Sequence, residues 1–158
     1  MAGYHRHMNA RRLLLGLIAL FAASAAVAAT PTCAPVVDQA WIRAAPPTAM
    51  ALAGYARVRN GCIRAVAIVG ARSAVFGSAM LHATATTGGM STMREASALR
   101  VPARGGLRFS PGGNHIMLMA PRGALPEGRR VRIELLLSDG RAIAADFVVR
   151  RDAPPDAP

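Results

Sequence analysis

No long amphipathic helical pattern occurs after residue 30, and this absence constrains the fold more than any other feature of the sequence. The chain instead consists of short apolar runs separated by Gly, Pro and Asn, a pattern typical of β-strands. Strands at such regular spacing favour an antiparallel sandwich or barrel, built as a single domain over residues 30–150. The predicted strands are Val36–Arg43, Leu52–Arg59, Ile63–Val69, Ser78–Ala83, Met90–Arg94, Leu99–Val101, Leu107–Phe109, His115–Met119, Arg129–Leu137 and Ala142–Val149.

Three turn signals divide these strands. Asn60-Gly61 predicts a tight turn, after which the chain returns as the third strand. Thr87-Gly88-Gly89 turns the chain into the strand that begins at Met90. Ser138-Asp139-Gly140 predicts a closing hairpin between the last two strands.

The two ends of the chain lie outside this domain. Residues 1–29 have a basic head, an apolar run and small residues at the end, which together describe a secretory signal peptide. A retained membrane anchor is the alternative, but the run is short and weakly apolar toward its end. We therefore expect a periplasmic protein with no stable membrane anchor after cleavage. The tail 151–158, RDAPPDAP, is predicted to be disordered.

Two cysteines, Cys33 and Cys62, remain after the predicted cleavage. In an oxidising compartment an isolated pair most often forms a disulfide. A thiolate metal site is the alternative, but neither cysteine has a second Cys or His near it in sequence. The disulfide is the favoured interpretation.

The basic residues are all arginine, 19 in total against 8 acids, and three of them fall in the leader. They are scattered, and few aromatic side chains accompany them, so we do not expect nucleic-acid binding. We interpret the arginines as a solvated surface on which arginine replaces lysine through a compositional bias. A weak attraction of this surface to an acidic partner stays open.

Histidine and methionine cluster in one part of the sequence. Two histidines and six methionines follow the predicted leader. Both of these histidines and five of these methionines lie between residues 80 and 119. The segment GNHIMLM places His115, Met117 and Met119 at alternate positions, so that in a strand they share one face. Ile116 and Leu118 would then point to the core.

The chemistry of these donors points to monovalent copper. Thioether sulfur and neutral imidazole are soft to borderline ligands that suit Cu(I), whereas zinc favours thiolate or carboxylate beside histidine and calcium favours oxygen. Methionine in a strand is more often packing than a ligand. However, packing alone does not explain why each histidine lies beside methionine. We find no nucleophile motif and no paired acids, so an enzyme is not expected.

The spacing His82-x10-Met93-x21-His115-x-Met117 resembles the copper motif of the PCuA(C)-type periplasmic copper chaperones. Further likeness lies in the segments 40–47, 53–55 with Asn60, 111–119 and 125–128. The resemblance implies a cupredoxin-like Greek-key sandwich or barrel that binds one Cu(I) through His82, Met93, His115 and Met117. It also implies delivery of copper to the CuA site of cytochrome c oxidase, through subunit II or its assembly factors.

This chain departs from the family at Met80, where an acidic residue is usual, and in its cysteine pair. Met80, Met90 and Met119 are possible additional ligands. Two other functions stay open at this point. One is copper buffering or resistance without delivery, and the other is a β-sandwich interaction module whose methionines only fill the core.

Overall fold

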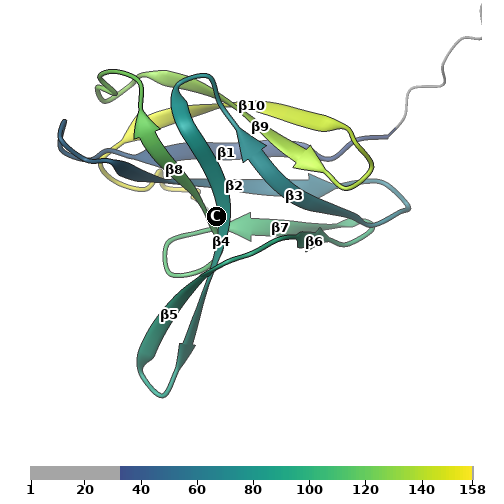
Figure 1. Cartoon of the computed structure of the whole chain (residues 1–158). Coiled ribbons are helices and arrows are strands. Elements are labelled where there is room, and N and C mark those ends of the chain that lie inside the picture. The colour runs from purple at the N-terminus through teal and green to yellow at the C-terminus, as the bar shows by residue number, and fades with distance from the viewer. Residues whose placement is uncertain (1–32, 158) are drawn as a thin grey trace, which may run out of the picture. The chain divides into compact units, whose positions relative to one another are not determined.

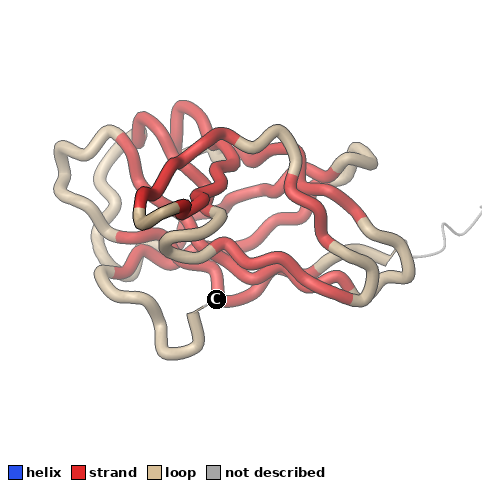
Figure 2. The backbone as a smooth tube through the Cα atoms, turned by 90° about the horizontal axis from the view of Figure 1, so that it is seen from below, coloured by secondary structure: helices blue, strands red, loops and turns tan. Residues whose placement is uncertain are grey.

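A computed structural model describes residues 33–157 of the chain, and within them every regular element is a β-strand (Figures 1 and 2). The strands are β1 (Val36–Arg43), β2 (Ala51–Asn60), β3 (Val66–Arg72), β4 (Phe76–Thr87), β5 (Met90–Glu95), β6 (Leu99–Val101), β7 (Gly105–Phe109), β8 (His115–Pro121), β9 (Arg130–Leu137) and β10 (Ala142–Arg150). Each predicted strand exists, and the all-β single domain is confirmed. The largest difference is in β4, which runs on to Thr87 and forms a projecting hairpin with β5 (Figure 1).

The strands form a closed barrel. Their order is β5-β4-β8-β2-β1-β10-β9-β3-β6, and an additional pairing between β3 and β4 joins the two sides of the sheet. The barrel departs from the predicted all-antiparallel arrangement at one place, where β1 pairs with β10 in parallel. A hairpin connection cannot produce a parallel pair, but strands from the two ends of the domain can meet in either direction.

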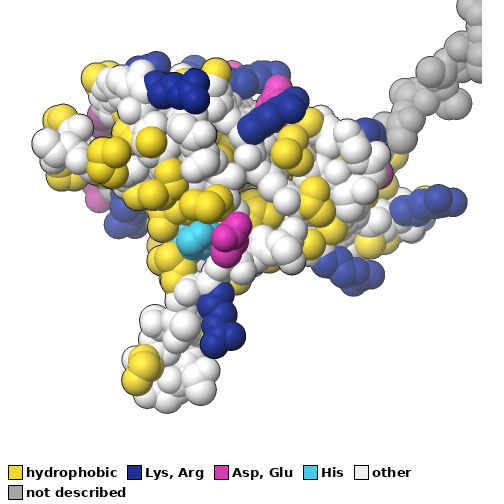
Figure 3. All heavy atoms as spheres, in the orientation of Figure 1, with side chains coloured by type: hydrophobic (Ala, Val, Ile, Leu, Met, Phe, Trp, Pro, Cys, Tyr) yellow, Lys and Arg dark blue, Asp and Glu magenta, His cyan; other side chains and the backbone are white. Residues whose placement is uncertain are grey.

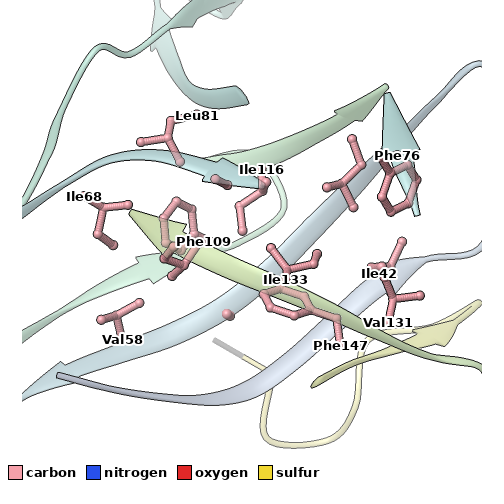
Figure 4. Packing of buried hydrophobic residues seen from close by; sticks show 14 of the residues in the cluster. Ile42, Val58, Ile68, Phe76, Leu81, Phe109, Ile116, Val131, Ile133 and Phe147 are labelled. Atoms are coloured by element: carbon pink, nitrogen blue, oxygen red, sulfur yellow. The ribbon is translucent and has the colours of Figure 1, made fainter. Parts of the chain in front are cut away.

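Alternation of side chains along the strands fills the barrel interior. Ile42, Phe76, Phe109 and Phe147 are among the largest fully buried side chains (Figure 4). Each such side chain stabilises the fold by about 1.5–3 kcal/mol relative to an exposed position. This core fixes which residues of each strand face outward.

Asn60 does not lie in the β2–β3 tight turn that the Asn-Gly pair suggests. β2 pairs with β1, β7 and β8, whereas β3 pairs with β4, β6 and β9, so the chain crosses from one part of the barrel to another after Asn60. The Asn60 side chain is buried, where its amide nitrogen donates to the carbonyls of Arg64 and Pro102 and its oxygen accepts from the backbone N–H of Cys62. These bonds to three separate places explain why a buried amide is tolerated here.

The predicted disulfide is present. Cys33 and Cys62 are bonded, with their Cα atoms 5.7 Å apart, and the bond ties the segment before β1 to the end of β2. Residues 151–157 are also described, and Arg151 forms an ion pair with Glu127. The predicted signal peptide lies outside the described residues. Among those that are described, no helix is long and apolar enough to cross a membrane.

Candidate metal centre

The two histidines of the described residues meet on the β4–β8 ladder. His82 and His115 are direct partners in its register, and their ring centroids lie 5.5 Å apart. Residues opposite each other in a ladder point to the same face, so both rings lie on the side of the strands that faces away from the barrel interior. His115 is nevertheless buried, with 5% of its surface exposed, and His82 is half-buried. Figure 3 shows a histidine side chain on this surface, at the base of the projecting hairpin.

One metal ion can contact both rings at this separation. A metal–imidazole bond of about 2.0 Å places the ion roughly 3 Å from the ring centroid, so two rings that share an ion have centroids no more than about 6 Å apart. The observed 5.5 Å falls inside this limit. The geometry of the two rings therefore fits a shared ion.

Hydrogen bonding leaves the His115 ring ready to act as a ligand. Nδ1 of His115 lies 3.0 Å from the carbonyl oxygen of Gly113. A carbonyl can only accept, so Nδ1 carries the proton and the lone pair of the neutral ring is on Nε2. A backbone partner of this kind is what commonly orients a metal-binding histidine.

His82 has an unsatisfied nitrogen. Its Nδ1 is buried and has no hydrogen-bond partner among the described residues. An unpaired buried polar atom is costly, and such an atom beside a second imidazole is consistent with a bound ion.

The methionines of β8 follow the predicted alternation. Ile116 and Leu118 are fully buried in the core, whereas Met117 and Met119 lie on the outer face with the histidines. Met117 pairs directly with Met80 of β4. Met80 and Met117 are therefore the next outward-facing residues to the histidine pair, one on each strand. Met80 occupies the position at which the family usually has an acidic residue.

Met93 comes to this face through the β4–β5 hairpin. It pairs with Thr84, which is the next outward residue of β4 after His82. All six residues of β5 are exposed, and Met93 itself is 50% exposed. Gly88 and Gly89 turn the hairpin, as the sequence predicted, and both have a positive φ. Met93 thus lies on the same face as the histidines, on a projecting element.

Glu95 is a neighbour of the cluster that sequence reasoning did not assign. It pairs directly with His82 in the β4–β5 register. Figure 3 shows an acidic side chain next to the histidine. The sequence contained the information needed to find Glu95. In a hairpin with a two-residue turn at Gly88-Gly89, pairing the residues on either side of the turn in order places position 95 opposite position 82.

Within residues 33–157, no three side chains of the His, Cys, Asp or Glu types come together so that they could hold a metal ion. The sulfur-bearing side chains nearest in register to the histidine pair are those of Met80 and Met117. Thioether sulfur suits a soft metal ion such as Cu(I).

A family model described as "Putative lipoprotein LpqE-like" matches residues 36–149. The chain belongs to the LpqE-like family. A relative of the chain, "Putative lipoprotein Lxx21020" of Leifsonia xyli subsp. xyli, is 39% identical over 105 residues, which are 66% of this chain. The match spans 62% of that relative's length.

Solved structures place this LpqE-like chain in the PCuAC fold. It superimposes on the apo PCuAC domain of PmoF1 with a TM-score of 0.63 at 23% identity, over 76% of this chain and 94% of that domain. Cu(I)-bound DR1885 of Deinococcus radiodurans matches with a TM-score of 0.60 at 31% identity, over 81% of this chain and 84% of that one. The resemblance to the PCuA(C) family and the barrel fold are confirmed.

Proposed function

We propose that this LpqE-like protein is a periplasmic, non-enzymatic carrier of Cu(I). The ion is its cargo, and we assign His82, Met93, His115 and Met117 as the ligands. The observation that carries the proposal is the pairing of His82 with His115, whose ring centroids are 5.5 Å apart on the face that also carries the thioethers. The solved relative DR1885, which holds Cu(I), supports the choice of metal.

The ligand set favours a metal that can be released. Two imidazoles and two thioethers are neutral, so the bound centre keeps the single positive charge of Cu(I) and suits a surface position. Met93 stands on the exposed strand β5, where an incoming donor can replace its sulfur first. The more enclosed His115 would leave last. Stepwise exchange of this kind delivers the ion to a tighter, thiolate-bearing acceptor.

Titration of Cu(I) against histidine and methionine variants tests the metal site. The double variant His82→Ala/His115→Ala is expected to lose at least a hundredfold in Cu(I) affinity, because half of the ligand set is removed. Met93→Leu/Met117→Leu keeps the side-chain volume and removes only the sulfurs, so it separates ligation from packing. Met50→Leu, at an exposed methionine outside the cluster, is the matched control. Wild-type affinity in both double variants would rule out the site.

We propose the CuA site of cytochrome c oxidase subunit II as the acceptor. Mixing the Cu(I)-loaded protein with apo subunit II should transfer the ion, which is followed by the appearance of the CuA absorption spectrum after reconstitution. Retention of copper by a protein that binds it normally would contradict delivery to this acceptor and favour buffering.

A further inference from the structure

The outward residues of β2 continue from the candidate metal centre into a basic region. Ala53 pairs with Met117, and the next outward residues along β2 are Tyr55, Arg57 and Arg59. Arg57 in turn pairs with Arg108 of β7. The metal ligands and these arginines therefore lie on one face of the barrel, with Arg57 about 13 Å along β2 from the position opposite Met117.

A groove opens between these arginines. It has a volume of about 560 Å³ and is lined by Arg57, Arg59, Asn60, Gly61, Arg104, Gly105, Gly106, Leu107 and Arg108. Four guanidinium groups line it and no carboxylate does. We call it the arginine groove.

Internal ion pairing neutralises only part of this charge. Asp38 accepts hydrogen bonds from Nε of Arg57 at 2.7 Å and Nε of Arg59 at 2.6 Å. Among the residues that the structure describes, no acid forms an ion pair with Arg104 or Arg108. The groove therefore keeps a net positive charge, which attracts an anionic group.

A carboxylate elsewhere in the chain acts electrostatically on one arginine of the groove. The pKa of Arg57 is raised above its ordinary value, chiefly by the hydrogen bond to Asp38 and to a lesser extent by the charge of Asp156. Asp156 follows the last strand β10, so polypeptide outside the barrel strands can place a negative charge within electrostatic range of Arg57.

We propose that the arginine groove is a docking site for an acidic segment of a partner protein. Its position beside the candidate metal centre would bring that partner's metal-accepting groups to the exposed Met93, a consequence that rests on the proposed function. Aspartate and glutamate side chains match the separate guanidinium groups, which present paired donors to carboxylates.

Calorimetric titration of the metal-free protein with a hexa-aspartate peptide tests the proposal. Arg104→Gln/Arg108→Gln is expected to weaken peptide binding about five- to tenfold, because two partly exposed charge pairs are lost. Arg104→Lys/Arg108→Lys keeps the charge and should retain most of the affinity. Arg100→Gln/Arg130→Gln, at exposed arginines outside the groove, is the control and should change affinity less than twofold. Raising the salt concentration should weaken binding to the wild type.

The proposal is overturned if Arg104→Gln/Arg108→Gln binds the peptide as tightly as the control variant Arg100→Gln/Arg130→Gln. It is also overturned if hexa-lysine binds as well as hexa-aspartate, or if inorganic phosphate binds as tightly as the peptide. Because the titration contains no copper, its result stands whether or not the copper-carrier function is correct. Cu(I) affinity should be unchanged in Arg104→Gln/Arg108→Gln.

Discussion

At the scale of single residues, Asp38 shows how a surface charge can also be structural. Its carboxylate joins two arginines on the neighbouring strand β2, opposite a bulge in β1 where Gln39 has a positive φ. The pKa of Asp38 is lowered, mainly by the hydrogen bond from Arg57. The folded state thus binds a proton at Asp38 less readily than the unfolded chain does.

The lowered pKa of Asp38 predicts a pH-dependent contribution to stability. The contribution is complete at pH values above 3.8, the pKa of Asp38 in the unfolded chain. It is lost as the pH falls through the lower pKa that Asp38 has in the folded state. Asp38→Asn should therefore reduce the free energy of unfolding by about 1 kcal/mol at pH 7, and the difference from the wild type should vanish near pH 2. Urea unfolding at both pH values measures it, with the exposed Asp152→Asn as the control. A difference that is the same at both pH values would exclude this ionic origin.

At the scale of elements, the β4–β5 hairpin supplies the candidate ligand Met93 from outside the barrel wall. Its strands are fixed by their own pairing and by the Gly88-Gly89 turn, since β5 pairs with β4 alone. The position of Met93 relative to the histidines therefore depends on this turn.

Replacing both turn glycines tests that dependence. Gly88 and Gly89 have φ values of 58° and 79°, with open space around each position, so Gly88→Ala/Gly89→Ala costs about 1–2 kcal/mol per residue through conformation alone. We expect weaker Cu(I) binding with little change in the unfolding temperature of the barrel. Gly61→Ala, also in open space but without a positive φ, serves as the control. Unchanged Cu(I) affinity in a variant whose β5 amides lose hydrogen-exchange protection would remove Met93 from the ligand set.

The strands were predictable because alternation is a local property. Ile116 and Leu118 pointed inward and Met117 outward as the period of two required. The pairing of His82 with His115 was not derivable from periodicity, since it joins two strands, β4 and β8, that are far apart in sequence. The motif spacing anticipated their proximity without supplying that physical reason. Asn60 illustrates the converse, because a residue that was interpreted as a local turn signal also donates a hydrogen bond to the carbonyl of Pro102, a sequence separation of 42 residues.

At the scale of the whole molecule, the first and last strands pair with each other, and the disulfide adds a covalent connection near the start of the domain. The bond closes a loop over a sequence separation of 29 residues. A crosslink of this span restricts the unfolded chain far more than the folded one.

Removing the disulfide should affect stability and leave the metal site intact. Cys33→Ser/Cys62→Ser is expected to lower the free energy of unfolding by about 3–4 kcal/mol. The variant should still bind one Cu(I) with wild-type affinity at a temperature where it remains folded. Denaturant unfolding and Cu(I) titration provide the two measurements. Loss of copper from the folded variant would revive the thiolate alternative.

The Cys33–Cys62 disulfide also determines whether a cysteine sulfur is available for attachment to lipid. Lipoproteins are attached to a bilayer by a thioether on a cysteine sulfur, and the family description refers to lipoproteins. In the folded domain both sulfurs of this chain are already bonded to each other. A disulfide and a thioether to lipid would use the same sulfur, so at Cys33 the two bonds are mutually exclusive.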